Sequence, residues 1–160
     1  MTHGAEHDVS SQTPVTSTSA MIAGMTPFLH QDRCVYATFK RPIDSGLLIE
    51  ILDISNAIFN EGKDGLSILL PLEKLGALSD HLSMVEPIMR HIELQVYSSL
   101  EGVGLTAAIA NALTAINLPC NVVAALKHDH IYVPEDRADE AMMALHRLVE
   151  EAKRKQSSAT

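Results

Sequence analysis

The second half of the chain limits the possible folds most strongly. Residues 90–97 alternate apolar and polar side chains, which is typical of a half-buried strand. Residues 105–116 carry apolar side chains at helical spacing and are otherwise mostly alanine, which suits a helix packed closely on a sheet. Two short strands at 120–126 and 130–133 and a helix at 135–152 follow. This β-α-β-β-α order predicts an antiparallel sheet with both helices on one face.

The first half of the chain predicts a degenerate β-β-β-α order of strands and helix. Residues 43–55 fit a helix or a strand equally well, because short apolar runs have no decisive period. For the other segments we expect strands at 33–39, 56–60 and 66–71, a short helix at 72–78 and a connection at 79–86.

A chain of 160 residues suits one ordinary domain or two very small ones. Because two half-sized cores are marginal alone, we expect the two halves to share one sheet or to pack closely. The expected organisation is an N-terminal unit over 25–86 and a C-terminal unit over 90–153. Residues 1–24 are rich in serine and threonine and predict a disordered tail, and 154–160 predict a flexible one.

Composition excludes several classes of function. The net charge of −8 disfavours nucleic-acid binding through the general surface, and the 4% aromatic content with no tryptophan disfavours stacking platforms. Two cysteines cannot form a disulfide scaffold or a four-thiolate zinc site. No apolar run approaches the ~20 residues that span a bilayer, and the first residues do not resemble a secretory signal. We therefore expect a cytoplasmic protein that does not bind membranes.

The strand-to-helix junction at 98–106, with the sequence SSLEGVGLT, is the strongest candidate for a ligand site. Gly102 and Gly104 permit a sharp turn and a close approach to the backbone. The first turn of the following helix offers unpaired N–H groups and the positive end of the helix dipole, which suit a carboxylate. The spacing matches neither a P-loop nor a dinucleotide-binding motif. A plain capped turn is the alternative.

His128 and His130 form the second candidate. At positions i and i+2 of an extended segment they face the same side and could bind a metal, but no further ligand is arranged beside them. Asp129 between them is a common turn residue, so a hairpin turn is the simpler interpretation. Two other roles for these histidines remain as alternatives, namely contact with an amino-acid ligand and acid–base catalysis. Nucleophilic catalysis has little support, since Cys120 begins an apolar strand and no serine lies in a G-x-S-x-G motif.

These motifs carry a family resemblance. Residues 94–108 resemble the C-terminal half of small tandem ACT-domain proteins, and 119–124 and 128–134 strengthen that resemblance. The C-terminal half is also similar to ACT domains of the CASTOR type. The match in the first half is looser, at 25–27, 35–38 and 65–71.

The resemblance implies an α+β, ferredoxin-like fold that binds a free amino acid at the glycine junction or between units, without catalysis or a cofactor. The family glycine corresponds to Gly104, and Asn121 and Val122 would form the facing wall. The implied ligand-binding residues are Ser99, Gly102, Val103, Gly104, Leu105, Thr106, Asn121 and Val122. The resemblance also implies a homodimer. We thus expect a regulatory amino-acid-binding protein, with an oligomerisation module whose site is vestigial as the main alternative and a small metal-dependent enzyme as the second.

The metal alternative can be tested directly. Because the ligand set around the histidine pair is incomplete, we expect purified protein to hold no stoichiometric zinc, nickel or iron by elemental analysis. Replacing both histidines (H128A with H130A) should leave the effect of added or chelated metal on the melting temperature at zero. Stoichiometric metal in the wild type that disappears in the double variant would support the enzyme instead.

Overall fold

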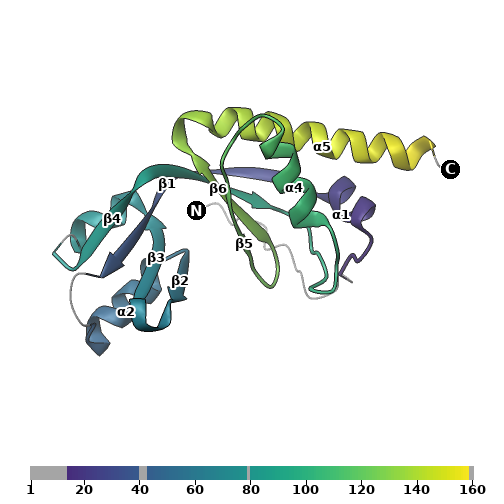
Figure 1. Cartoon of the computed structure of the whole chain (residues 1–160). Helices are drawn as coiled ribbons and strands as arrows, with labels where there is room; N and C mark the ends of the chain where they lie inside the picture. Colours follow the sequence, from purple (N-terminus) through teal and green to yellow (C-terminus); the bar gives the residue numbers. More distant parts are fainter. Residues whose placement is uncertain (1–13, 40–42, 79, 159–160) are drawn as a thin grey trace, which may run out of the picture.

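The computed structural model describes residues 14–39, 43–78 and 80–158. It contains one six-stranded antiparallel sheet with helices (Figure 1). In chain order the elements are α1 (Thr18–Gly24), β1 (Pro27–Phe39), α2 (Ser45–Ile54), β2 (Ala57–Asn60), η2 (Gly62–Asp64), β3 (Leu66–Pro71), α3 (Leu72–Leu75), η3 (Gly76–Leu78), β4 (Leu82–Leu94), α4 (Leu105–Thr114), β5 (Asn121–Ala124), β6 (Asp129–Pro134), η4 (Glu135–Arg137) and α5 (Ala138–Ser158).

The sheet order β2-β3-β1-β4-β6-β5 contains two interlocked units. The first unit, β1-α2-β2-β3-α3-β4, has the strand order β2-β3-β1-β4, which is ferredoxin-like. The second, β4-α4-β5-β6-α5, has the order β5-β6-β4-β1 and therefore uses β1 as its fourth strand. The expected β-α-β-β-α order of the second half is confirmed, and the two halves do share one sheet.

The two long strands β1 and β4 belong to both units. They pair with each other from Pro27 opposite Leu94 to Phe39 opposite Leu82, with register shifts between Leu29 and Arg33 and between Cys34 and Tyr36. Within β1, only the second half pairs with β3, and within β4, only the second half pairs with β6. The connection expected at 79–86 is wrong, because β4 already begins at Leu82 and crosses the expected boundary between the units. In Figure 1, β1 and β4 accordingly run from one half of the molecule to the other.

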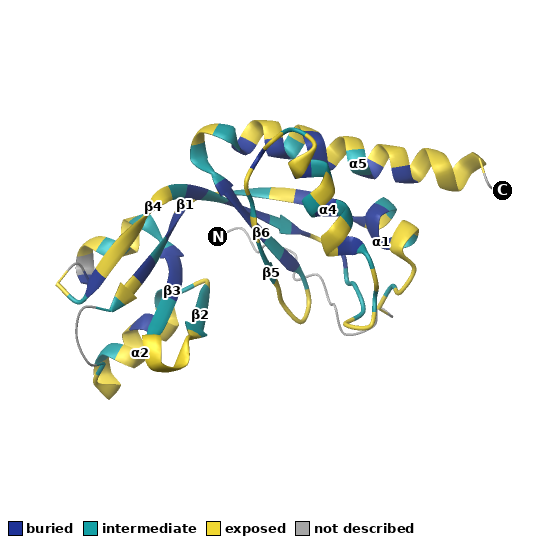
Figure 2. Cartoon of the chain, viewed as in Figure 1, coloured by how far each residue is buried: buried dark blue, intermediate teal, exposed yellow. Residues whose placement is uncertain are grey.

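Each unit has its own apolar core beneath its helices. Leu82 and Ile88 of β4 contribute to the N-terminal core, and Ile92 and Leu94 contribute to the C-terminal core. Alternate residues of a strand share a face, so both cores lie on the same face of β4. Figure 2 shows the resulting pattern, with buried residues along the central strands and exposed residues on the outer side of α5. On the opposite face, Cys34, Leu69, Met89 and Tyr132 form a smaller buried cluster to which no described helix contributes.

The expected disordered tail is wrong for residues 14–24, whereas residues 1–13 lie outside the described part. Val15 forms a bridge with Ser98, and the helix α1 follows. Met21 is fully buried and Ile22 nearly so, in the same core as α4 and α5. The serine- and threonine-rich composition of the segment obscures the short apolar run Met21–Ile22, which packs into the C-terminal core.

The expected flexible end is also wrong for residues 154–158, which continue α5 as its last exposed turn. The hydroxyls of Ser157 and Ser158 donate to the carbonyls of Lys153 and Arg154, at 3.1 and 2.7 Å. Residues 159–160 lie outside the described part. Among the described residues, no helix combines the length and the apolar character that a membrane span requires.

The burial of α1 leads to a stability prediction. Truncating Met21, which is 0% exposed, should leave a cavity in the C-terminal core, so Met21→Ala should lower the free energy of unfolding by about 2–5 kcal/mol. Met143→Ala, at a methionine that is 60% exposed on α5, is the matched control and should cost less than about 0.5 kcal/mol. Urea denaturation of both variants measures the difference. Equal unfolding midpoints would show that α1 does not pack in solution.

Candidate functional site

A small cavity lies where β4 leads into α4. Its volume is about 130 Å³. The wall is formed by α1, the loop after β4, the start of α4, and the ends of β5 and β6 that meet there. The lining residues are Met21, Ser98, Ser99, Leu100, Gly102, Leu105, Thr106, Ala124, Ala125 and Asp129. The cavity therefore coincides with the SSLEGVGLT junction that the sequence singles out.

The start of α4 is arranged to receive an anion. Gly104 is the N-cap residue with φ 97°, and no side chain caps the first turn. The first hydrogen bond within the helix runs from the Ala108 N–H to the Gly104 carbonyl, at 2.9 Å. The N–H groups of the residues between them have no partner within the helix, and they carry the positive end of its dipole. Leu105 and Thr106 from this turn line the cavity.

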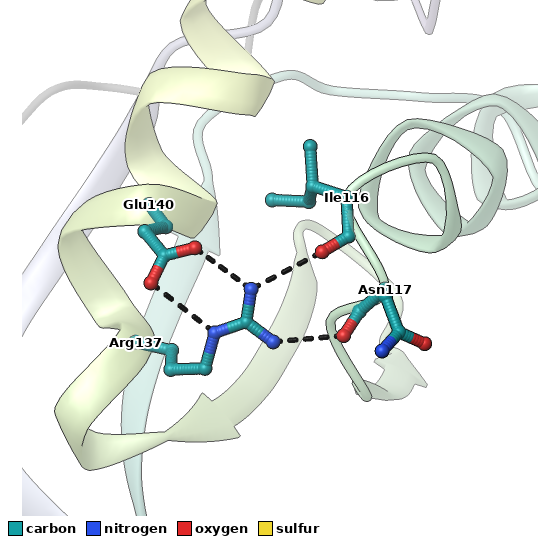
Figure 3. A network of polar contacts seen from close by, with 4 residues as sticks. All are labelled: Ile116, Asn117, Arg137 and Glu140. Carbon is teal, nitrogen blue, oxygen red and sulfur yellow. Dashed lines mark hydrogen bonds and ion pairs between the residues drawn. The ribbon is translucent and has the colours of Figure 1, made fainter.

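The other end of α4 is fixed by Arg137 from η4 (Figure 3). Its guanidinium donates to the carbonyl of Asn117 at 2.7 Å and to that of Ile116 at 3.1 Å, just beyond the last turn of the helix. The same group forms a two-point ion pair with Glu140 of α5, at 2.7 and 3.2 Å, and lowers the pKa of that carboxyl. Arg137 thus satisfies carbonyls that a helix end leaves open and holds α4 against α5.

Asp129 supplies the opposite charge in the cavity. It is the first residue of β6 and lies opposite Leu94, at the end of β4 that leads into the loop. Its side chain is only 6% exposed, and this burial raises the pKa of its carboxyl, while His130 and His128 act in the opposite direction. A buried carboxylate next to a helix N-terminus offers acceptors and donors within one small space. The sequence predicts a turn residue at Asp129, outside the expected site.

The structure brings half of the expected site residues to the cavity. Ser99, Gly102, Leu105 and Thr106 line it. Val103 is 77% exposed and lies outside the lining, as do Gly104, Asn121 and Val122.

The register of β5 against β6 explains why Asn121 is remote from the cavity. It lies opposite Tyr132, three positions along β6 from Asp129, which corresponds to about 10 Å of strand. Its side-chain N–H donates to the Met89 sulfur at 3.7 Å, on the face away from the helices. Val122 packs against the C-terminal core instead. The wall that faces α4 is therefore the far end of β5, Ala124 and Ala125.

The sequence predicts that the two junction glycines admit a ligand, but contacts within the protein and the backbone conformation already restrict both positions. A Cβ at Gly102 would lie 2.9 Å from the Ser99 carbonyl oxygen, and Gly104 has a positive φ of 97°, which favours glycine. A Cβ at Gly102 would lie 2.7 Å from the Met21 sulfur, and one at Gly104 would lie 2.9 Å from the Thr18 methyl group. The Thr18 hydroxyl donates to the Val103 carbonyl between them. The segment before α1 is held by the N–H of Val15, which donates to Tyr97 at 3.0 Å. The N-terminal segment therefore shapes the loop and closes one side of the cavity.

The second candidate, His130, belongs to a row of stacked rings on the helix-free face. Its Nδ1 lies 2.9 Å from Nε2 of His91, so one of these nitrogens donates to the other. The His91 ring stacks on His30, with centroids 4.2 Å apart, and on Tyr132 at 4.8 Å. The Nε2 atom of His30 lies 3.2 Å from a carboxylate oxygen of Glu93. Among the described residues, the buried Nδ1 of His128 has no hydrogen-bond partner.

The buried imidazoles of His91 and His130 stay uncharged near neutral pH. Burial lowers the pKa of His91 to about 4, helped by His30 and His130 and opposed by Glu93. Burial also lowers the pKa of His130. Within residues 14–39, 43–78 and 80–158, no group of three or more histidine, cysteine, aspartate or glutamate side chains is placed to hold a metal ion.

Comparisons with known proteins identify the fold. No family model matches the chain, and no curated protein matches it either. The regulatory subunit of aspartate kinase from Thermus thermophilus, in its ligand-free form, superposes with a TM-score of 0.54 over 78% of this chain and 97% of that one, at 13% identity. A putative C-terminal regulatory domain of aspartate kinase from Porphyromonas gingivalis gives 0.53 over 78% and 96%, at 18% identity. The fold is ACT-like.

A protein of unknown function from Vibrio cholerae, described as a possible transport protein, is also similar. It is 29% identical, with a TM-score of 0.67 over 82% of this chain and 94% of that one. The ACT-like fold is thus shared with proteins of nearly the same length, several of which are regulatory subunits or domains.

The row of histidines predicts a pH dependence of folding. The pKa of His91 is about 4 in the folded state, whereas an unperturbed histidine of the unfolded chain has a pKa of 6.5. The unfolded state therefore binds more protons between these two pH values. The contribution of the uncharged His91 side chain to folding stability is present above pH 6.5 and is lost as the pH falls towards 4. His91 by itself accounts for up to about 3 kcal/mol.

Urea denaturation at pH 7 and at pH 4.5 measures this loss. His91→Phe keeps a stacked ring but removes the titration, so this variant should lose less stability between the two pH values than the wild type. His146→Gln, at an exposed histidine of α5, should lose as much as the wild type. Identical losses of stability between pH 7 and pH 4.5 in all three proteins would contradict the assignment of the pH dependence to His91.

Proposed function

We propose that this protein is a non-catalytic regulatory protein that binds a small free amino acid in the cavity at the β4–α4 junction. The observation that carries the proposal is the pairing of an uncapped helix N-terminus with the buried carboxylate of Asp129 in one cavity. The ACT-like fold shared with regulatory subunits of aspartate kinase supports it. The two interlocked units and the sequence motifs support assignment to the small tandem ACT proteins, with a CASTOR-type C-terminal unit.

The two charged groups of an amino acid fit the two ends of the cavity. The ligand carboxylate accepts from the N–H groups at the start of α4, where the dipole favours an anion. The ligand ammonium donates to Asp129, and a cation there lowers the pKa of that carboxyl towards its usual value. The hydroxyl of Thr106 and the backbone near Ser99 provide further polar contacts.

The size of the cavity limits the ligand. At about 130 Å³ it is well below the ~300–1,000 Å³ typical of drug-sized sites, so only an amino acid with a small side chain fits. The cavity is bordered by α1, α4 and β6. A ligand that bridges α4 and β6 stabilises one arrangement of these elements, which provides the basis for allosteric regulation.

The main alternative is an oligomerisation module whose cavity binds nothing. Both hypotheses use the same fold, so ligand binding decides between them. The metal-dependent enzyme is less well supported, because His130 is engaged by His91 and, among the described residues, no group of three or more potential ligands is placed to hold a metal ion.

The test is a binding screen with the twenty free amino acids. Thermal shift and titration calorimetry of the wild type should identify a small amino acid, and a ligand at 100 times its Kd should add about 2.7 kcal/mol of stability. Asp129→Asn removes the charge that pairs with the ammonium but keeps the shape. It should weaken binding at least tenfold, or about 1.4 kcal/mol.

Asp80→Asn, at an exposed aspartate of the other unit, is the matched control and should bind as the wild type does. Absence of binding at millimolar concentrations of every amino acid would favour the oligomerisation module. Equal binding by the wild type and by Asp129→Asn would place the amino-acid site elsewhere.

A further inference from the structure

An open groove lies between the helices α4 and α5. Its volume is about 410 Å³, and it shares no lining residue with the cavity at the β4–α4 junction. It extends along residues 108–116 and 144–151, which is about two turns of each helix. We call it the α4–α5 groove. Its apolar lining consists of Ala108, Ala112, Ala115, Ile116, Ala144 and Leu148.

Helix α4 has an outer side without any charge. No charged residue lies between Glu101 and Lys127, a stretch that contains the whole helix. The side chains of Ala107, Thr114 and Ala115 are nevertheless exposed. A surface helix normally carries charged and polar residues on the side away from its core. Small uncharged side chains instead let the backbone of another helix approach closely, so α4 is suited to a further helix contact.

The charges at the α4–α5 groove come from α5. Arg147 and Glu151 line the groove one helical turn apart, and both side chains are exposed. Within the described part of the chain, neither forms a hydrogen bond or an ion pair, whereas Lys153 pairs with Glu150 on the same helix. The groove therefore offers one positive and one negative group beside an apolar floor.

We propose that the α4–α5 groove binds an amphipathic helix of another protein. Large apolar side chains of the partner, one turn apart, fill the space above the alanines. The flank of the partner helix carries an acidic residue opposite Arg147 and a basic residue opposite Glu151. The guanidinium of Arg147 suits a carboxylate, because its N–H groups can donate to both oxygens. The two opposite charges fix the register and the direction of the partner helix.

A second copy of this chain fits the groove less well. Two grooves facing each other place alanine against alanine and leave space unfilled, which a well-packed contact does not tolerate. Helix α2 exposes Leu48 and Leu52, which are large enough to fill the groove. Its charged residues are Glu50 and Asp53, so it offers no basic group to Glu151. Charge complementarity therefore favours a different protein.

Selection from a library of displayed helical peptides tests the proposal. The peptides have about 18 residues, or five turns, with apolar residues along one side and varied charged residues on both flanks. The full chain is the target, and its variant Ala115→Arg, in which a long side chain occupies the groove, is the counter-target. We expect enriched peptides that carry an acidic and a basic residue one turn apart. By titration calorimetry they should bind the wild type with a micromolar Kd and Ala115→Arg at least tenfold more weakly.

Charge reversal on α5 tests the register. Arg147→Glu should weaken the binding of the enriched peptides at least tenfold, and a peptide whose acidic residue is replaced by lysine should restore it. Two matched variants should bind as the wild type does, namely Thr114→Arg, on α4 outside the groove lining, and Lys74→Glu on α3. Circular dichroism should be unchanged in all four variants, since each replaced side chain is exposed.

Three results would overturn the proposal. One is a library from which no peptide binds the wild type more tightly than it binds Ala115→Arg. Another is a set of enriched peptides that bind Arg147→Glu as tightly as the wild type, which places their contact elsewhere. The third is a dimer in sedimentation velocity that Ala115→Arg dissociates, which assigns the groove to a second copy. Because these measurements contain no free amino acid, their outcome does not depend on the proposed ligand site.

Discussion

The pairing of β1 with β4 is the constraint on which the rest of the structure depends. A ferredoxin-like unit needs four strands. The first half of this chain contributes β1, β2 and β3, and the second half contributes β4, β5 and β6, so each half has only three strands of its own. Each unit becomes complete because the first strand of the other unit serves as its last. The two apolar cores are therefore formed along the same pair of 13-residue strands, and neither core has a complete sheet without that pair.

The cavity depends on a second assembly of distant segments. Its floor and walls come from the loop after β4, the starts of α4 and β6, the end of β5, and a helix that precedes the sheet in the chain. Met21 and Thr18 of that helix occupy the space that the glycines at 102 and 104 leave open. A glycine-bearing loop that would suit a ligand in isolation is here partly filled by the protein itself, and the remaining space is small for that reason.

Much of the fold follows from the sequence, because alternation at 90–97 and helical spacing at 105–116 are strong local signals. The sequence alone left 43–55 undecided, and α2 forms there with Asp44 accepting from the Leu47 N–H at its start. The segment at 82–88 was missed because it lies on an edge, contains a proline and shows no alternation of burial. Asp129 was missed because its role depends on lying opposite Leu94, a pairing between strands 34 residues apart in the chain that no local pattern reveals.

The continuity of β4 has a mechanical consequence. Its 13 residues run from the N-terminal core to Leu94, which lies opposite Asp129. Paired strands resist bending within the sheet but share a common twist. Both apolar cores and the loop that lines the cavity are therefore attached to one strand, so a change in the twist of β4 alters the geometry of the cavity and of the distant unit together.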